Sequence, residues 1–290
     1  MKLIMTLLVK NECDIIRQNI EFHLSSGVDH IIAIDNGSRD GTRDILADYE
    51  RRGIVTVIDE PRQNYAQSEW VTAAALRARD EFGADWILNN DADEFWLAPS
   101  GDLKQEILSA TTGKLICERR NMLYACDDEN IWNWLDKARY RVAEPVSFTK
   151  PRDIFENSLP APYLSLMLPP KMLLIAHGLE SVSQGNHDGS YESSMNTLDS
   201  PIKIYHYPIR SKKQIRVKVM QGGEAYARNK ELAPSTGWHW RRWYHILQNQ
   251  GIEAVLADIL PSSDSLRSDR ETGIVIEDNT MRSHLTALTE

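Results

Sequence analysis

Three features are missing from this sequence: long apolar runs, clustered cysteines and an excess of basic residues. No segment approaches about eighteen consecutive apolar residues, so no transmembrane span is predicted. The three cysteines, Cys13, Cys117 and Cys126, lie far apart without metal-type spacing, which indicates reduced thiols in a cytoplasmic protein. The apolar run 2–9 has no small-residue cleavage site after it, which favours a buried strand over a signal peptide.

The net charge of −9 argues against general nucleic-acid binding. Within this acidic chain, residues 203–242 contain ten Lys or Arg and only two acids. Such a basic patch suits a small anionic ligand, and peripheral contact with a membrane surface is a further use. A solvated helix face is the simpler alternative. The remaining composition, 42% hydrophobic and 26% charged over 290 residues, allows a sizeable core.

The first part of the chain alternates strand and helix signals. Short apolar runs predict buried strands, and stretches with helical spacing of apolar residues, each ending near a glycine, predict helices. The predicted strands are 2–9, 30–35, 54–59 and 85–90, and the predicted helices are 12–27, 43–53 and 68–83. This alternation predicts an α/β fold with a mostly parallel, Rossmann-like sheet flanked by helices, and ligands bind such sheets beyond the carboxyl ends of the strands.

The distal part of the chain has a different pattern, with longer mixed strands and a basic helix. The predicted strands are 114–124, 139–148, 171–178 and 202–208, and the helix 211–229 is expected to end or break near Gly222 and Gly223. We expect a single domain over 1–250, with a nucleotide-binding half (1–96) and an acceptor and metal-completing half (97–250). A C-terminal helical tail is expected over 251–290.

Polar residues follow each of the predicted parallel strands. The stretch "LNNDADEFW" places Asp91, Asp93 and Glu94 directly after a buried strand, where their mutual repulsion has to be offset. A divalent cation is one explanation, because such ions prefer oxygen ligands, and a solvated turn is the other. The second strand leads into "DNGSRDGT", in which Asp35 is placed to hydrogen-bond a nucleobase edge; an ordinary strand–turn–helix connection is the alternative.

The combination "LVKNECDII … DNGSRDGT … NNDADEFW" resembles the family 2 glycosyltransferases of the GT-A fold. The branch it resembles has an Asp-x-Asp-Glu-Phe motif and distal "GNH" and "HYP-x-R-S" segments, which appear here at 185–187 and 206–211. The resemblance is dense over 1–96 and patchy over 171–226. It implies transfer of a sugar from a nucleoside diphosphate donor to an acceptor hydroxyl, with bound Mn²⁺ or Mg²⁺ stabilising the leaving diphosphate.

The resemblance also implies roles for individual residues. Asp93 is the first choice as a metal ligand, Asp91 holds the metal or the ribose, and His206 completes the metal site. Glu94 is expected to orient a ligand or the acceptor. The other residues expected to bind the donor are Lys10, Glu12, Asp35 and Asn36 after the first two strands, and Lys213 and Arg216 on the basic helix. His187 and His177 are weaker candidates for the metal. Lys212 and Lys218 could also reach the diphosphate, but helix periodicity lets only some of these cations face one way. For His206 the alternative is a core histidine, and for the helix cations it is a solvated face.

The catalytic base is less well defined. Inverting transfer needs a carboxylate that takes the proton of the acceptor hydroxyl as it attacks. Relatives carry a Glu-Asp pair about ninety residues beyond the acidic motif, and this sequence has none there. Asp188 and Glu224 are the candidates, with Glu180 as a third, and each is alternatively a surface carboxylate.

The sequence as a whole predicts a metal-dependent, inverting glycosyltransferase of polysaccharide biosynthesis or a related pathway. The acceptor is a glycan, a glycolipid or a small molecule, and a UDP-sugar is the default donor, with guanosine and thymidine donors left open. Tryptophans 238, 240 and 243 are expected to cover an acceptor site or to pack the tail. The alternatives are a sugar nucleotidyltransferase and a catalytically inactive nucleotide-binding protein of the same fold.

Overall fold

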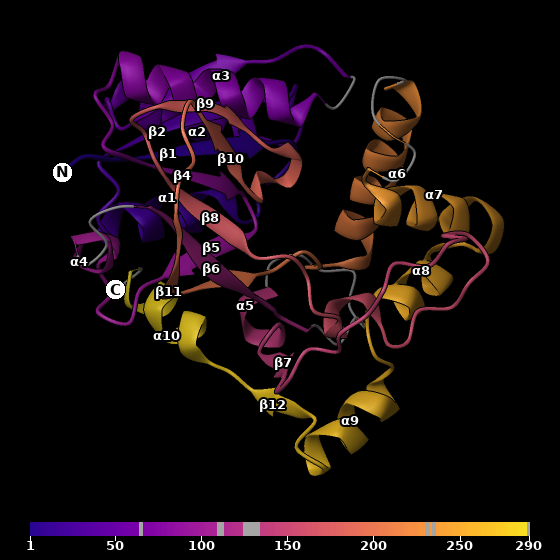
Figure 1. Cartoon of the computed structure of the whole chain (residues 1–290). Helices are drawn as coiled ribbons and strands as arrows, with labels where there is room; N and C mark the ends of the chain where they lie inside the picture. The colour runs from indigo at the N-terminus through magenta and orange to yellow at the C-terminus, as the bar shows by residue number, and fades with distance from the viewer. Residues whose placement is uncertain (64–65, 109–112, 124–133, 230–232, 234–235, 289–290) are drawn as a thin grey trace.

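The amino-terminal part of the chain folds into the predicted alternation of strands and helices (Figure 1). The computed structural model describes residues 1–63, 66–108, 113–123, 134–229, 233 and 236–288. The elements of this first part are β1 (Leu3–Val9), α1 (Ile16–Ser25), β2 (His30–Asp35), α2 (Thr42–Arg51), β3 (Val55–Asp59), α3 (Gln67–Asp80), β4 (Trp86–Asp91), β5 (Glu94–Leu97) and α4 (Leu103–Leu108). Strand β5, directly after the acidic motif, was not predicted.

One eight-stranded sheet organises the chain, in the order β3-β2-β1-β4-β8-β6-β11-β5. The first four strands in this order are parallel, so their carboxyl ends lie at one edge; Leu7 of β1 pairs with Ala33 of β2 and with Asn90 of β4. In the second half β8 is antiparallel to both neighbours, whereas β11 is parallel to β6 and antiparallel to β5. The added strands are β6 (Lys114–Asn121), β8 (Lys171–Ile175) and β11 (Thr197–His206).

Alternating side chains of the parallel strands cover both faces of the sheet. Leu3, Met5 and Leu7 pack on one face in the same cluster as residues of α1, α2 and α4. Ile4 points to the opposite face, where the alanine-rich side of α3 and residues of β9 (Leu179–Val182) cover it. The result is the predicted α/β fold, with helices on both faces of the sheet and parallel pairing of the strands within residues 1–96.

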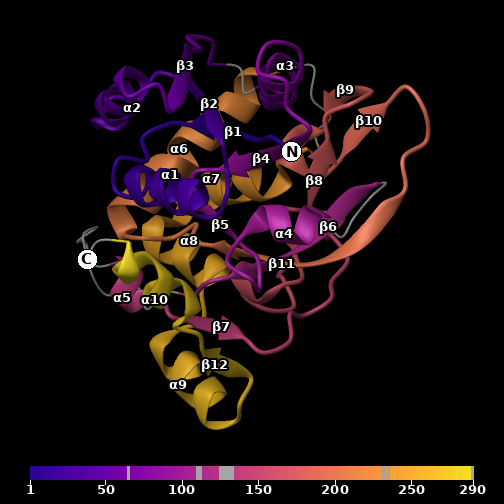
Figure 2. The same ribbon diagram turned by 90° about the vertical axis from the view of Figure 1, so that its left-hand side faces the viewer.

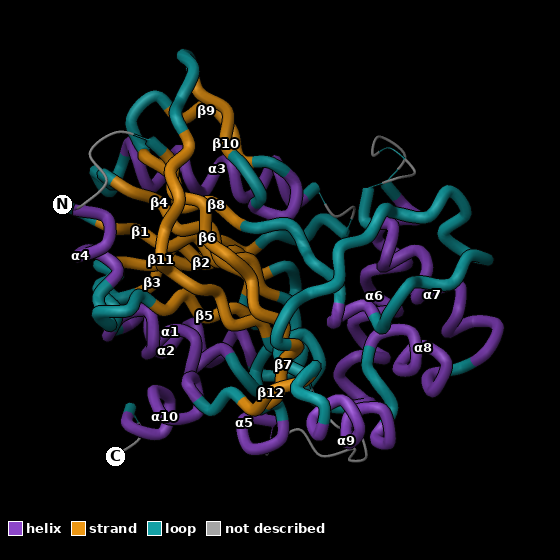
Figure 3. The backbone as a smooth tube through the Cα atoms, turned by 60° about the horizontal axis from the view of Figure 1, so that its bottom comes forward, coloured by secondary structure: helices purple, strands orange, loops and turns teal. Residues whose placement is uncertain are grey.

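The distal helices gather beside the sheet (Figures 1 and 3). They are α6 (Lys212–Arg228), α7 (Trp238–Gln250) and α8 (Ile252–Ile259). Helix α6 does not end at the double glycine, as the sequence suggested, but continues through it. Gly222 and Gly223 let α7 approach, since a Cβ at position 223 would lie 2.3 Å from the Tyr244 side chain.

The C-terminal segment is mostly helical but also contributes a strand. It contains α9 (Ser263–Glu271), β12 (Val275–Glu277) and α10 (Thr280–Ala287), and β12 pairs with β7 (Tyr140–Val142) at one end of the molecule (Figure 2). Helix α10 returns to α1, where His284 contacts the Phe22 ring. The short elements are α5 (Trp134–Lys137), η2 (Tyr163–Ser165), η3 (Gln184–Asn186) and β10 (Gly189–Tyr191).

Two structural findings concern the predictions made from composition, namely those about a transmembrane span and about the cysteines. No described helix combines the length and the hydrophobicity that crossing a membrane requires. Cys13 and Cys117 are free thiols, and Cys126 lies outside the described residues.

Candidate functional site

A cavity of about 640 Å³ lies at the carboxyl ends of β1 and β4 and extends to α6 and α7. Residues after β1, the acidic motif after β4, and His206 at the end of β11 all line it. Chain segments more than one hundred positions apart therefore meet here, as the rule for ligand sites in α/β sheets predicts.

Asp93 and His206 lie side by side in the lining of this cavity. Asp93 Oδ1 lies 3.7 Å from His206 Nε2, and both side chains are buried. The other ring nitrogen, Nδ1, lies 2.9 Å from Asn121 Oδ1, an acceptor, so Nδ1 carries the hydrogen and Nε2 carries a lone pair. Two hydrogen-bond acceptors thus point at each other, an arrangement that a cation between them would stabilise.

The Arg119 guanidinium lies over the imidazole face of His206. Its Nη2 atom is 3.2 Å from Nδ1 and 3.5 Å from Nε2 of the imidazole. An atom in the plane of the ring could not lie at both distances without a clash with the ring, so Nη2 lies above the ring face. Burial, and next the charge of Arg119, hold the pKa of His206 well below its usual value. The imidazole is therefore neutral at physiological pH, which is the form that binds metal ions.

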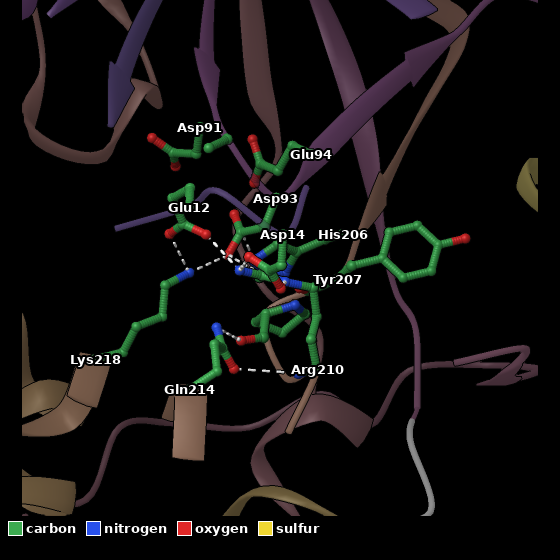
Figure 4. A network of polar contacts seen from close by, with 12 residues as sticks. Glu12, Asp14, Asp91, Asp93, Glu94, His206, Tyr207, Arg210, Gln214 and Lys218 are labelled. Carbon is green, nitrogen blue, oxygen red and sulfur yellow. Dashed lines mark hydrogen bonds and ion pairs between the residues drawn. The ribbon is translucent and has the colours of Figure 1, made fainter. Parts of the chain in front are cut away.

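A network of ion pairs holds the carboxylates at the end of β1 and in the acidic motif (Figure 4). Lys218 Nζ lies 2.8 Å from Glu12 Oε1 and 2.7 Å from Asp93 Oδ2, and Arg210 binds Glu12 from the other side. Burial alone would raise the pKa of Asp93, but the charges of Lys218 and Arg210 outweigh it and lower that pKa. Asp93 is thus ionised, with one oxygen on Lys218 and the other toward His206.

Asp91 occupies a separate position in the motif. Its Oδ2 lies 2.5 Å from Lys171 Nζ, and its Oδ1 accepts a hydrogen bond of 3.3 Å from Asn186. The same Lys171 nitrogen lies 2.5 Å from Glu94, whose side chain is fully buried and also pairs with Arg119 at 3.1 Å. Lys171 therefore offsets the repulsion between Asp91 and Glu94, and Glu94 faces the interior rather than the cavity.

The residues expected to bind the donor are partly brought together. Lys10 and Asn36 line the cavity with Glu12, and Lys10 Nζ donates to Asn36 Oδ1 at 3.3 Å. Burial, and next the charges of Arg228 and Arg39, lower the pKa of Lys10. Asp35 does not line the cavity. Its Oδ2 accepts the Ser38 amide hydrogen at 3.1 Å, and its buried Oδ1 has no hydrogen-bond partner among the residues that the structure describes.

Four expected site residues lie elsewhere. Lys213 and Arg216 are exposed on α6 and do not line the cavity, because the helix turns Lys218 inward instead. Asp188 pairs with Lys114, and Glu224 pairs with Arg228 at 3.0 Å; neither carboxylate lines the cavity.

Three cations that sequence reasoning did not assign to the site have a central place in it. They are Arg119 on β6, Lys171 on β8 and the fully buried Arg210 before α6. Arg210 stands in the "HYPIRS" segment, which the resemblance singled out. Lys171 and Arg119 carry no comparable signal, because their position depends on which strands pair in the second half of the sheet.

Aromatic residues form the other end of the cavity. The ring centroids of Trp240 and Trp243 are 5.3 Å apart, and Tyr163 contacts Trp243 at 4.9 Å. His239 and Trp238 also line this part. The cavity thus has a charged end at the sheet and an aromatic end at α7.

Among the described residues, no group of three or more His, Cys, Asp or Glu side chains is arranged to hold a metal ion alone. Asp93 and His206 fit a different type of site, in which protein supplies two ligands and substrate phosphates and water supply the others. The charged end, with Lys218 and Lys10 nearby, suits a diphosphate.

Residues 5–117 match the sequence model of glycosyltransferase family 92. This segment runs from within β1 to within β6 and includes the acidic motif. The match supports the glycosyltransferase class for this part of the chain, but it is to family 92 and not to the family 2 branch that the motifs resembled. No curated protein matches the chain significantly.

Among solved structures, the chain is similar to S. aureus TarS, with a TM-score of 0.44 and 12% identity over 89% of this chain and 50% of that one. The chain thus spans half the length of that TarS chain. It is also similar to the fragment TarS 1-349 in complex with UDP-GlcNAc, with a TM-score of 0.42 and 11% identity over 89% of this chain and 84% of the fragment. Values this low assign neither activity nor ligand.

Proposed function

We propose that this protein is a metal-dependent, inverting glycosyltransferase that moves a sugar from a nucleoside diphosphate donor to a hydroxyl of a glycan, a glycolipid or a small molecule. The observation that carries the proposal is the pair of facing acceptors, Asp93 Oδ1 and His206 Nε2, 3.7 Å apart at the charged end of the cavity. The family 92 match over residues 5–117 supports the class of reaction.

Asp93 and His206 are the residues that would hold Mn²⁺ or Mg²⁺. A hard divalent ion accepts carboxylate oxygen, and Mn²⁺ also accepts imidazole nitrogen. When bound, the ion neutralises the charge that develops on the leaving diphosphate. Because Asp93 is ionised and His206 is neutral, both side chains are already in the ligating form at neutral pH.

The other charged residues orient the donor. Lys218, between Glu12 and Asp93, places a positive charge where the diphosphate oxygens would lie. Lys10 and Asn36 lie beyond Glu12, on the side of the sheet where β1 and β2 end, and are placed for the nucleoside. UDP is the nucleotide we expect. We expect the acceptor to bind at the aromatic end of the cavity, near Trp240.

Thermal unfolding with UDP, GDP, dTDP, CDP and ADP, each with and without Mn²⁺, tests this function. A nucleotide at about 100 times its Kd adds about 2.7 kcal/mol to the free energy of unfolding, a shift of several degrees. We expect a Mn²⁺-dependent shift with UDP that is lost in Asp93→Asn. The matched control is Asp264→Asn, since that side chain is 91% exposed on α9.

Two results would contradict the proposal. The first is the absence of a shift with every nucleotide. The second is a shift that needs neither Mn²⁺ nor Asp93. Release of pyrophosphate from a nucleoside triphosphate and a sugar phosphate would instead identify a nucleotidyltransferase.

A further inference from the structure

His187 lines the same cavity and has a fixed tautomer. Its Nδ1 lies 2.9 Å from the carbonyl oxygen of Pro170. A carbonyl oxygen only accepts hydrogen bonds, so Nδ1 carries the hydrogen and Nε2 carries the lone pair. Among the described residues Nε2 has no hydrogen-bond partner. The side chain therefore offers the cavity one free proton acceptor.

The backbone next to His187 leaves room for this ring. Gly185 has a φ of +80°, and a Cβ built there would lie 2.8 Å from His187 Nε2. A larger residue at position 185 would therefore press against the atom that carries the lone pair. The loop itself is tied to the charged end of the cavity, because the neighbouring Asn186 donates to Asp91.

The carboxylates of the cavity are all engaged. Among its described lining residues they are Glu12, Asp91 and Asp93. Glu12 pairs with Arg210 and Lys218, Asp93 pairs with Lys218, and Asp91 pairs with Lys171. Protonation of any of these carboxylates would break its ion pairs. Burial raises the pKa of Glu12 despite its two cations, but Lys218 and Arg210 both bind its carboxylate. Asp188 and Glu224, the bases expected from the sequence, do not line the cavity.

We propose that His187 Nε2 is the general base of the transfer that the preceding subsection assigns to this site, on which the inference rests. The acceptor oxygen forms a bond to the anomeric carbon of the donor sugar. The bond from that carbon to the diphosphate oxygen breaks, and its electron pair leaves with the diphosphate. The acceptor proton moves to Nε2, and the resulting imidazolium releases it to water after the product leaves.

The His187 lone pair is not blocked by a proton at neutral pH. Burial lowers the pKa of His187 to about 4, and the charges of Lys171 and Arg119 act in the same direction, against the hydrogen bond to Pro170 and the charge of Asp91. In the absence of the donor, Nε2 is therefore unprotonated but a weak base. The negative charge of a bound diphosphate opposes the two cations and raises the basicity of Nε2 once the donor is present. His239 also lies near enough for the two imidazoles to interact electrostatically.

The test compares four variants for release of UDP from UDP-glucose, UDP-galactose and UDP-N-acetylglucosamine, with methyl glycosides as acceptors. His187→Gln and His187→Ala remove the base. His177→Gln is the matched control, because His177 is exposed on the turn between β8 and β9. His239→Gln tests the other histidine of the cavity. UDP and Mn²⁺ binding is measured by calorimetry on each variant, and ¹⁵N NMR of the wild type reads the tautomer of His187.

We expect kcat to fall by about 10²- to 10⁴-fold in both His187 variants, with UDP and Mn²⁺ binding unchanged. Added imidazole restores part of the activity of His187→Ala, and His177→Gln retains the wild-type kcat. His239→Gln changes the aromatic end of the cavity and is expected to lose less kcat than either His187 variant. A His187→Gln enzyme with a near-normal kcat, or a His187 protonated at Nε2, overturns this inference and leaves the proposed function intact. A wild type that binds no nucleotide and turns over none of the donors overturns both.

Discussion

Arg210 and Asp14, 196 positions apart in the chain, form a two-point ion pair: Arg210 Nε lies 2.5 Å from Asp14 Oδ2, and Nη2 lies 3.0 Å from Oδ1. The guanidinium is fully buried and also binds Glu12. It joins the segment after β1 to the segment before α6, the two parts of the chain that enclose the charged end of the cavity. Stability and site geometry therefore depend on the same side chain.

Replacing Arg210 by Met is expected to destabilise the protein by about 3–5 kcal/mol, because Glu12 and Asp14 would remain buried without their counter-charge. Urea unfolding measures the difference. The control is Arg267→Met, whose pair with Asp264 is exposed and is worth about 0–1 kcal/mol. Equal losses in the two variants would show that the buried pair has no special role.

Lys171 is predicted to be a second buried electrostatic support, since its side chain is only 1% exposed and contacts both Asp91 and Glu94. Lys171→Met is expected to cost about 3–5 kcal/mol, because Glu94 would keep only Arg119 as its counter-charge. Adding Glu94→Gln is expected to recover part of the loss, because it removes the buried negative charge that has lost a partner. The comparison is Lys203→Met, which breaks a half-exposed pair with Glu118. Purely additive effects of the Lys171 and Glu94 substitutions would contradict the prediction.

Because α6 and α7 pack closely, replacing a glycine of α6 by alanine is expected to change the stability in the opposite direction to the usual one. Ala normally stabilises a helix interior by about 1 kcal/mol relative to Gly. Gly223→Ala is instead expected to destabilise by about 1–3 kcal/mol, because the new Cβ would lie 2.3 Å from Tyr244. Gly222→Ala, 3.0 Å from the Trp240 ring, should cost less. A more stable Gly223→Ala protein in thermal unfolding would contradict this packing.

The buried His23 predicts a loss of stability at mildly acidic pH. Burial lowers its pKa to about 4, while in the unfolded chain it stays near 6.5. Between these values the unfolded state binds the proton and the folded state does not, so the free energy of unfolding falls as the pH drops from about 6.5 to about 4. The His23 contribution is about 3 kcal/mol over that range.

Urea unfolding at pH 7, 6 and 5 checks this prediction on the wild type, His23→Gln and the exposed control His177→Gln. His23→Gln should lose stability overall, since His23 accepts the Trp96 amide hydrogen at 3.3 Å, but show a smaller pH dependence. Other histidines with a lowered pKa, such as the half-buried His239, also contribute to the pH dependence of stability, so some of it remains in His23→Gln. Identical pH dependence in all three proteins would rule out a role for His23.

The sequence predicts the parallel half of the fold well because its signals are local. The run 2–9 becomes β1 at Leu3–Val9, and the run 85–90 becomes β4 at Trp86–Asp91. The break expected in the basic helix was wrong, because tertiary packing against Tyr244 and Trp240 offsets the low helix propensity of Gly222 and Gly223. Strand β5 is short and follows the acidic motif directly, so no turn signal separates it.

The site was predictable where a strand ends in polar residues, as with Asp93 and His206, which the structure places side by side. Their metal role stays a prediction. The cations of α6 that line the cavity could not be identified from the sequence. Helical spacing shows which residues share a side of the helix, but not which side faces the cavity. That choice, made by packing of α6, turns Lys218 inward and Lys213 outward. Lys171 depends on the antiparallel pairing of β8 with β4, which has no local signal.

The most direct test of the central claim is pulsed electron paramagnetic resonance of Mn²⁺ bound with UDP, on the wild type, His206→Gln and the control His177→Gln. The account predicts a ¹⁴N coupling from His206 in the wild type and in the control, and its loss in His206→Gln. UDP-dependent Mn²⁺ binding with no nitrogen coupling, or a coupling that survives His206→Gln, would contradict it.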